Sequence, residues 1–556
     1  MKNKAITDTT KAPSQAGQPE LVLLACLIAG FCSRIRESYR FFFLIYCGIG
    51  ALITFLLIRT GPVVIMRFGH DVPVYLDSAW RVLCGQIPHV DFQQVLGALF
   101  FLILAAGMKI CGVSVWGIVC ANILMFWLFS FWAWILAVKR LSAPLAFLFT
   151  LAVGLFITGT YHLGFDYTVT TYTTLYNRYG YAMLFIVILE LFFPLRKEKK
   201  LHESAGGFST GFLLVCLWFI KINYFTAASL FILLRILLAV PSKDWVKGFM
   251  AGFFCAIVPM ALYFRFSFSA VVHDYRIVSM VRGYEILMDS ALFMEKIGPF
   301  AYVFILLPFY MLLFSSFAFT ARGGINSPVK LFVIMGVSGF CGILLNMTNY
   351  GIHDMPMLLV MAFLPFEYFD LKVDRSKEFK CYLLFPLLLI CIFTVGSFYG
   401  KNLASIVFAG TNKARMRNSI TKIKSETLNT LSVDFADGSY NREYPEKINE
   451  GLELLRKHIA EHDRIVSLDF ENPFPVGLRL KSPKGFYGMC NFGVDFNNEH
   501  YIPPERAFSD TTLIMVPKPG CPESTLPLLR IYGDYMEKHF DFVESTERWM
   551  LYRRKP

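Results

Sequence analysis

The segment FGHDVPVYLDSAWRVLCGQIPHVDF, residues 68–92, carries three carboxylates directly after a very apolar stretch of the chain. Asp71 begins a segment whose apolar residues have the spacing of a helix lying on a membrane; they are Val74, Leu76, Ala79, Trp80 and Leu83. The dipole at the N-terminus of such a helix favours an ionised carboxylate. Asp71 is therefore predicted to act as a general base at neutral pH.

A second carboxylate, Asp91, follows the segment GQIPHV, a Gly/Pro turn that can bring it back towards Asp71. Two convergent carboxylates suit proton abstraction from an acceptor hydroxyl, or binding of a divalent metal that neutralises a phosphate leaving group. The plainer alternative is that each carboxylate caps a helix in solvent. Asp77 and Arg81 have the spacing of an ion pair along one helix face, and we assign both, with His89, to support of the loop.

The same residues belong to a longer motif. The pattern is Asp-(x)9-Arg-(x)3-Gly-(x)2-Pro-(x)2-Asp-Phe, with the residues Asp71, Arg81, Gly85, Pro88, Asp91 and Phe92, and it is followed by GALFFLILAAGMKICG. It resembles the first outer loop of the GT-C membrane glycosyltransferases, which include protein O-mannosyltransferases and lipid A aminoarabinose transferases. Many relatives have Gly-Pro or Pro-Pro where this chain has Gly97-Ala98, and a second acidic residue beside the first where it has Val72.

The resemblance implies an enzyme that takes a sugar from a polyprenyl-phosphate carrier and transfers it outside the cytoplasm. The acceptor is expected to be a lipid or glycan that presents a hydroxyl or a phosphate. Asp71, with Asp91 as a second catalytic carboxylate, is expected to assist a single displacement that inverts the anomeric carbon. No cofactor is assigned; a divalent metal is left open as a possible component.

A departing phosphate must be held by cationic side chains on other loops at the same membrane face. The candidates are Lys221, Arg178, Arg276, His273, Arg282 and His353. Lys221 is the most informative, because an ammonium group between two apolar runs is costly and usually functional; its alternative role is to extend to the interface. Arg178 and Arg276 can bind phosphate oxygens with paired hydrogen bonds, or contact lipid headgroups instead. The tyrosine-rich segment 161–179 can offer ring faces and hydroxyls to a sugar; the default interpretation is an interfacial aromatic belt.

The elements that position these residues are apolar helices. The chain has 556 residues, 55% of them hydrophobic, with a mean hydropathy of +0.51, which predicts a multi-pass helical membrane protein of GT-C-like fold. Runs of about 20 residues or slightly fewer, long enough to cross a bilayer, lie at 41–58, 114–138, 143–160, 180–195, 206–221, 225–240, 248–264, 300–320, 329–346, 356–371 and 380–399. These runs predict eleven transmembrane helices.

Basic residues set the predicted orientation. Residues 1–400 contain 31 Lys and Arg against 20 Asp and Glu, and the basic clusters occupy alternate connections between the apolar runs. This bias places those connections in the cytoplasm and argues against a nucleic-acid surface. The remaining loops, which carry the candidate residues, then share the outer face with the C-terminal region. To keep this alternation, the run 95–110 is interpreted as a re-entrant or membrane-surface helix.

Three regions follow from this layout. Residues 1–40 are predicted to form a cytoplasmic tail and interfacial segment, 41–400 the transmembrane catalytic domain with its first outer loop at 60–113, and 401–556 a periplasmic α/β domain. The last assignment depends on helical patterns at 444–462 and 524–540 and on the strand-like runs IVSLDF, TTLIMVP and RWMLYRR. Cys490 and Cys521 can pair if that domain faces an oxidising compartment. The resemblance suggests a bacterial inner membrane.

A different class of function is a transporter or flippase for a lipid-linked sugar. Transporters usually place charged residues near the bilayer midplane and repeat their halves. Here the polar residues gather at the ends of the apolar runs, and no second half mirrors the first. A scaffold that binds envelope partners is a third possibility, although it leaves the polar loops unexplained.

Overall fold

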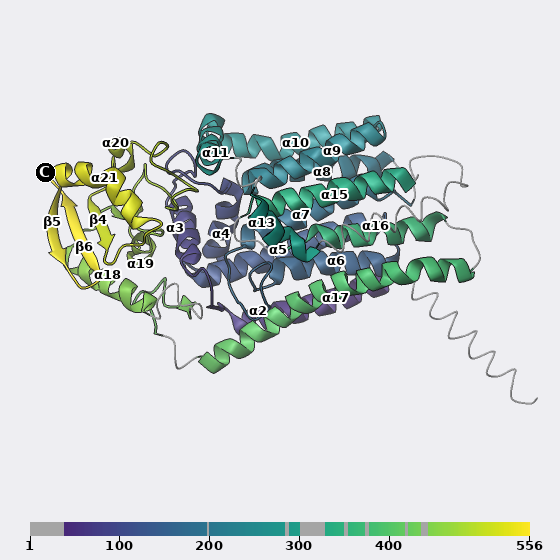
Figure 1. Cartoon of the computed structure of the whole chain (residues 1–556), viewed down its shortest axis with the longest axis horizontal. Coiled ribbons are helices and arrows are strands. Elements are labelled where there is room, and N and C mark those ends of the chain that lie inside the picture. The colour runs from purple at the N-terminus through teal and green to yellow at the C-terminus, as the bar shows by residue number, and fades with distance from the viewer. Residues whose placement is uncertain are drawn as a thin grey trace, which may run out of the picture.

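The computed structural model describes residues 38–196, 200–283, 289–300, 328–349, 354–372, 377–416, 421–434 and 443–556. Their apolar helices lie side by side in a bundle, and a small sheet lies beyond one end of it (Figure 1). The fold class is the one predicted, a multi-pass helical membrane protein with a C-terminal region that contains a sheet. Nearly all of the predicted tail, residues 1–37, lies outside the described part.

Six of the described helices are long and apolar enough to cross a membrane: α2 (Tyr39–Thr60), α5 (Val115–Ala137), α7 (Leu175–Phe192), α8 (Lys200–Ile220), α10 (Lys243–Tyr263) and α15 (Pro328–Met347). Shorter apolar helices are α4 (Ala98–Cys111), α6 (Ala143–Thr158) and α9 (Ile222–Leu238). Two more helices of the bundle are α16 (Met357–Lys372) and α17 (Lys377–Met416). The predicted run 300–320 falls outside the described residues except for Phe300, and each other predicted run coincides with one of these helices.

Close backbone contacts hold parts of the bundle together. A Cβ atom at Gly207 of α8 would lie 2.0 Å from the Trp245 carbonyl oxygen, and one at Gly252 of α10 would lie 2.0 Å from that of Phe208. Small residues spaced four apart allow such contacts between membrane helices. Helices α4 and α5 meet in the same way, since a Cβ atom at Gly107 would lie 2.1 Å from the Gly117 carbonyl oxygen. The short turn between these two helices makes them an antiparallel pair.

Helix α3 (Asp71–Leu83) begins at the predicted residue but is covered by protein. Figure 1 shows it across the end of the bundle that faces the sheet, near α11 (Phe268–Arg282). Its residues from Val72 to Ala79 are all buried, so both faces of the helix have protein neighbours. The expectation of a helix lying on the lipid surface is therefore wrong for α3. Its apolar stripe packs into the core between the bundle and the C-terminal region.

The C-terminal region, residues 421–434 and 443–556, contains a four-stranded sheet of order β3-β4-β6-β5. The strands are β3 (Ile465–Ser467), β4 (Leu513–Pro517), β5 (Phe540–Ser545) and β6 (Trp549–Arg554), with β3 parallel to β4 and the other pairs antiparallel. The helices are α18 (Tyr444–His458), α19 (Phe474–Leu478), α20 (Pro504–Ala507) and α21 (Thr525–His539). The predicted strand-like runs contain β3, β4 and β6, whereas β5 had no prediction.

Two further contacts concern this region. A short parallel bridge joins β1 (Val64–Ile65), which follows α2, to β2 (Ser432–Val433). Cys490 is buried and Cys521 is half-buried, and in the described structure these two thiols are not joined by a disulfide. The pairing that the sequence left open is therefore not formed.

Gly97, which precedes α4, provides a test of the close packing against α8. Its N–H donates to the Ile220 carbonyl oxygen at 3.0 Å, and a Cβ atom there would lie 2.1 Å from the Phe219 carbonyl oxygen. We expect Gly97→Ala to lower the free energy of unfolding by about 1–3 kcal/mol, because the backbone of α8 must move. Thermal unfolding in detergent measures this change. The control is Gly48→Ala, where nothing lies within 4 Å of the new Cβ atom; equal unfolding midpoints for both variants would contradict the prediction.

Candidate active site

A cavity of about 710 Å³ lies where the end of the bundle meets the C-terminal region. The first loop, residues 61–97, contributes Arg67, Phe68, His70 and Asp71. The other bundle residues that line the cavity are His162, Thr173, Thr174, Tyr176, Asn177, Lys221, Arg282 and Asn349. The C-terminal region lines the opposite side with Glu443, Tyr444, Lys447, Phe470, Met489, Asn491, Val494, residues 518–523 and Arg548. Loops far apart in the sequence therefore meet around one space, as the predicted topology requires.

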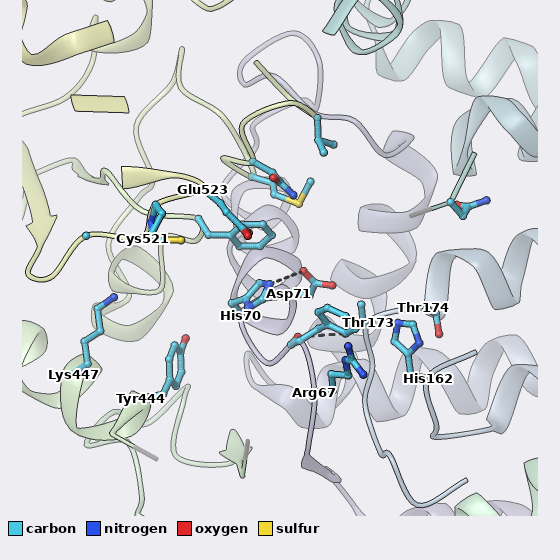
Figure 2. A pocket seen from close by; sticks show the side chains of 18 of the residues that line it. Arg67, His70, Asp71, His162, Thr173, Thr174, Tyr444, Lys447, Cys521 and Glu523 are labelled. Atoms are coloured by element: carbon cyan, nitrogen blue, oxygen red, sulfur yellow. Dashed lines mark hydrogen bonds and ion pairs between the residues drawn. The ribbon is translucent and has the colours of Figure 1, made fainter. Parts of the chain in front are cut away.

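Asp71 lies between the two sides of this cavity, which Figure 2 shows with Lys447 and Tyr444 on one side and His162 and Thr174 on the other. It is the first residue of α3, and its carboxylate oxygen Oδ1 is 3.7 Å from His70 Nε2. The imidazole of His70 in turn packs edge-on against the ring of Phe470, with centroids 4.2 Å apart. The candidate base thus lies at the junction between the first loop and the C-terminal region.

Burial changes the protonation of Asp71. The side chain is 16% exposed, and it lines the cavity. Burial raises the pKa of Asp71 to about 7, although its hydrogen bond with the Thr173 side chain acts in the opposite direction. The sequence predicts a fully ionised carboxylate from the helix dipole alone, so the desolvation penalty is the larger effect here. A carboxyl with a pKa near 7 is well suited to accept a proton at neutral pH.

Three cations converge on the C-terminal end of α15, beside Asn349. Lys221 Nζ donates to the Asn349 side-chain oxygen and lies 4.8 Å from the ring centroid of Tyr176. Arg282, the last residue of α11, donates to the Thr348 carbonyl oxygen at 3.2 Å. The third cation is Lys296 of α13 (Ser290–Ile297), which is fully buried. Its Nζ donates to the carbonyl oxygens of Asn346 and Asn349 at 3.1 and 2.7 Å.

This cluster has an excess of positive charge. Within the part of the chain that the structure describes, Lys221, Arg282 and Lys296 form no ion pair with a carboxylate. Burial, together with the positive charges of Arg282 and Lys296, lowers the pKa of Lys221 well below its ordinary value. Burial and the charge of Arg282 lower the pKa of Lys296 to about 8 against the opposing effect of Glu295. An anion bound here would relieve this repulsion, so the cluster is suited to hold a phosphate.

The other candidate cations lie elsewhere. Arg178 is buried in the bundle, where its guanidinium donates to the carbonyl oxygens of Phe156 and Tyr161 at 2.6 and 2.7 Å. His273 and Arg276 are exposed on α11, and neither they nor Arg178 is among the cavity residues. His353 lies outside the described residues. Of the predicted phosphate-binding residues, the structure therefore brings Lys221 and Arg282 together.

Asp91 is engaged away from the cavity lining. Its carboxylate oxygen Oδ1 is 2.9 Å from Lys484 Nζ, and Oδ2 accepts a hydrogen bond from the Ile87 N–H at 2.8 Å. The backbone of the Gly/Pro turn therefore binds the Asp91 side chain directly. Asp91 is not among the residues that line the cavity with Asp71. Asp91 does not cap a helix either, because the N–H that it binds belongs to the turn. The convergence of two carboxylates is not observed.

Of the three residues assigned to loop support, Asp77 and Arg81 form the predicted pair, and His89 has a partner that was not predicted. Arg81 Nε lies 2.7 Å from Asp77 Oδ2, with both side chains buried. His89 Nδ1 lies 2.9 Å from Asp274 Oδ2, which ties the first loop to α11. The same carboxylate oxygen accepts a hydrogen bond from the Gln94 N–H at 3.0 Å. The loop that carries Asp71 is thus fixed to the helix that ends at Arg282.

Several cavity residues had no role in the sequence analysis, chiefly Arg67, Asn349 and the residues of the C-terminal region. Lys296, which binds the Asn349 carbonyl oxygen, had none either. Tyr176 was assigned to an aromatic belt, yet it contacts Lys221 inside the cavity. Lys296 carries a sequence signal similar to that of Lys221, since it occurs in the apolar segment ALFMEKIGPF. In the described residues no group of three His, Cys, Asp or Glu side chains is arranged to hold a metal ion, so a metal requirement stays open.

Comparisons with known proteins give likenesses of fold. No family model matches the chain, and no curated protein matches it. Solved structures of ArnT from Cupriavidus metallidurans, in the apo state and bound to undecaprenyl phosphate, are similar at 9% identity and a TM-score of 0.45, over 92% of this chain and 97% of ArnT. The arabinofuranosyltransferase AftD from Mycobacteria is similar at 12% identity and a TM-score of 0.38, over 93% of this chain and 40% of AftD.

All of these likenesses are at 12% identity or less. With TM-scores below 0.5, they do not carry a reaction or a substrate over to this chain. The function therefore has to be argued from the residues around the cavity.

The raised pKa of Asp71 makes its replacement a test of stability. The pKa of Asp71 is about 7 in the folded protein and about 3.8 when the carboxyl is free. The free energy of unfolding therefore falls as the pH rises from about 4 to about 7, because the carboxyl ionises in the unfolded chain at a lower pH than in the folded protein. We expect Asp71→Asn to raise the thermal unfolding midpoint in detergent at pH 8, with a difference that narrows as the pH is lowered to 5. A lower midpoint for the variant at pH 8 would contradict the assigned burial.

Proposed function

We propose that this protein transfers a sugar from a polyprenyl-phosphate carrier to an acceptor of the cell envelope. The observation that carries the proposal is one cavity that holds a carboxyl of pKa near 7 together with cations that have no carboxylate partner among the described residues. A group that accepts a proton and a group that holds an anion are the two requirements of this reaction. The GT-C resemblance of the first loop supports the same assignment.

In this mechanism the acceptor oxygen attacks the anomeric carbon of the donor sugar. A new carbon–oxygen bond forms as the bond between that carbon and the phosphate oxygen breaks, and the acceptor proton passes to the carboxylate of Asp71. The phosphate leaves with the bonding electron pair, and Lys221 and Arg282 stabilise its added negative charge. A single displacement inverts the anomeric carbon.

Lys296 has a positioning role in this proposal. Its ammonium group binds the two carbonyl oxygens that flank the Asn346–Asn349 segment, and the Asn349 side chain binds Lys221. Lys296 therefore fixes the segment against which Lys221 is oriented, and it adds positive charge behind the phosphate.

The proposal places the cavity at the outer face of a bacterial inner membrane, with the C-terminal region in the periplasm and the N-terminus in the cytoplasm. The distribution of basic residues supports this orientation.

A transporter or flippase is the second candidate. It would need a polar path between the two membrane faces, formed by charged residues near the middle of the bilayer. The cavity lies instead at one end of the bundle, and the C-terminal region lines one side of it. This position favours chemistry at the membrane surface.

Asp71→Asn tests the base. In vesicles supplied with radiolabelled polyprenyl-phosphate sugars and an envelope extract, we expect at least a hundredfold slower transfer, within the range of about 10²–10⁴ for a lost general base. The wild-type rate should fall below about pH 7, since protonated Asp71 cannot accept a proton. The control is Asp166→Asn, an exposed carboxylate of the bundle. Equal rates for the Asp71 variant and the wild type would remove Asp71 from this role.

Lys221→Gln tests the phosphate site. Loss of one charge-assisted hydrogen bond corresponds to about 1.5–3 kcal/mol, so we expect the KM for the donor to rise by roughly one to two orders of magnitude. Lys422→Gln, which removes an exposed lysine of the C-terminal region, serves as the matched control. An unchanged donor KM in the Lys221 variant would place the phosphate elsewhere.

A further inference from the structure

Helix α11 has one face that packs against the protein and one that does not. Figure 1 shows it at the periphery of the bundle, beside the end of α10 that is nearer the C-terminal region. On the packed face, Asp274 contacts His89 of the first loop, and the Tyr275 hydroxyl donates to the Trp218 carbonyl oxygen at 2.9 Å. The residues of the other face recur at the spacing of a single helix face and are exposed; they are Ser269, Val272, His273, Arg276 and Met280.

The length of α10 places the start of α11 at the boundary of the membrane. The 21 residues of α10 span about 31 Å at about 1.5 Å per residue, which matches the roughly 30 Å of a hydrocarbon core. An exposed apolar stripe follows the helix along this length; it consists of Met250, Phe254, Val258 and Leu262. Lys243 and Lys247 mark one end of α10. Arg265 and Phe266, which follow its last residue, therefore lie at the opposite boundary.

The turn between α10 and α11 holds two large side chains in an unusual conformation. Arg265 and Phe266 have positive φ angles, 50° and 61°, in the region that favours glycine. Both side chains are exposed, and Phe266 is 72% exposed, so packing inside the protein does not account for either residue. An aromatic ring and a guanidinium at this depth are the groups that membrane-surface segments place at the level of the headgroups.

The exposed face of α11 is also positively charged. Among the described residues, the side chains of Arg265, His273 and Arg276 have no hydrogen-bond or ion-pair partner. Residues 264–283 contain one acidic residue, Asp274, and it is buried against the first loop. Cations without a compensating carboxylate, next to an apolar surface, attract the negative headgroups of anionic lipids.

We infer that α11 and the turn before it form a binding surface for anionic phospholipid headgroups. Phe266, Val272 and Met280 enter the boundary between headgroups and acyl chains, and Arg265 and Arg276 bind the lipid phosphates. The helix on the lipid surface that the sequence predicts at α3 is thus α11. The inference does not depend on the reaction assigned to the cavity, because it concerns lipid binding alone.

This surface connects lipid with the cavity. The buried face of α11 holds the first loop through Asp274, and the helix ends at Arg282, which lines the cavity. Lipid bound to the exposed face therefore braces a helix that contacts both the loop of Asp71 and the cation cluster.

Phe266→Trp tests whether this surface meets anionic lipid. The variant is reconstituted in phosphatidylcholine vesicles that contain, at matched mole fractions, phosphatidylglycerol or phosphatidylcholine brominated on the acyl chains near the headgroup. Bromine quenches tryptophan on contact, and subtraction of the wild-type fluorescence isolates the introduced indole. We expect quenching by brominated phosphatidylglycerol at a mole fraction at least about threefold lower, because two arginines attract its charge. The preference should shrink at about 1 M salt, where the Debye length falls to about 3 Å.

Arg265→Gln combined with Arg276→Gln, in the same background, removes the two charges. We expect the preference for phosphatidylglycerol to disappear while both lipids still quench, because the indole remains at the boundary. The matched control is Lys422→Gln with Arg530→Gln, which removes two exposed charges from the C-terminal region and should leave the preference unchanged. The Phe266→Trp variant alone decides the inference: equal quenching by the two lipids would refute headgroup recognition, and quenching by neither would place α11 away from the membrane.

Discussion

The buried ion pair between Asp77 and Arg81 is the interaction on which the cavity depends. Both side chains are almost unexposed, and the pair is completed from the C-terminal region: the Ser482 hydroxyl donates to Asp77 Oδ1 at 2.6 Å, and Arg81 donates to the Pro483 carbonyl oxygen at 2.6 Å. Removing one partner from such a pair typically costs about 3–5 kcal/mol. The two charges are therefore satisfied only while α3 and the segment at 482–483 remain together, which keeps Asp71 at the junction.

This docking joins two surfaces with different chemistry. The bundle supplies cations held by the end of α15, and the C-terminal region supplies Lys447 and Arg548, which are paired with carboxylates of that region. The His89–Asp274 contact connects the first loop, which carries Asp71, with α11, which ends at Arg282. Neither surface alone surrounds the cavity. The arrangement explains why a polar loop follows so apolar a span.

Local patterns predicted the elements better than they predicted the site. Periodicity placed the start of α3 at Asp71, and apolar length located the helices of the bundle, because both properties belong to continuous segments. The partner of Asp91, the burial of Arg178 and the contacts of Lys296 depend on segments distant in the sequence. No spacing rule within one segment contains that information. Strand β5 escaped prediction because its alternation is weak on an exposed edge of the sheet.

The difference between the predicted and the observed state of Asp71 links docking to chemistry. At the end of an exposed helix, the dipole and water would keep its pKa low, and a weakly basic carboxylate would be a poor proton acceptor. Contact of the first loop with the C-terminal region surrounds the same carboxyl with protein and raises its pKa to about 7. The Asp77–Arg81 ion pair secures this contact. It therefore affects the pKa of Asp71, which lies six positions before Asp77 in the chain. The raised pKa of Asp71 thus depends on the same contact that completes the wall of the cavity.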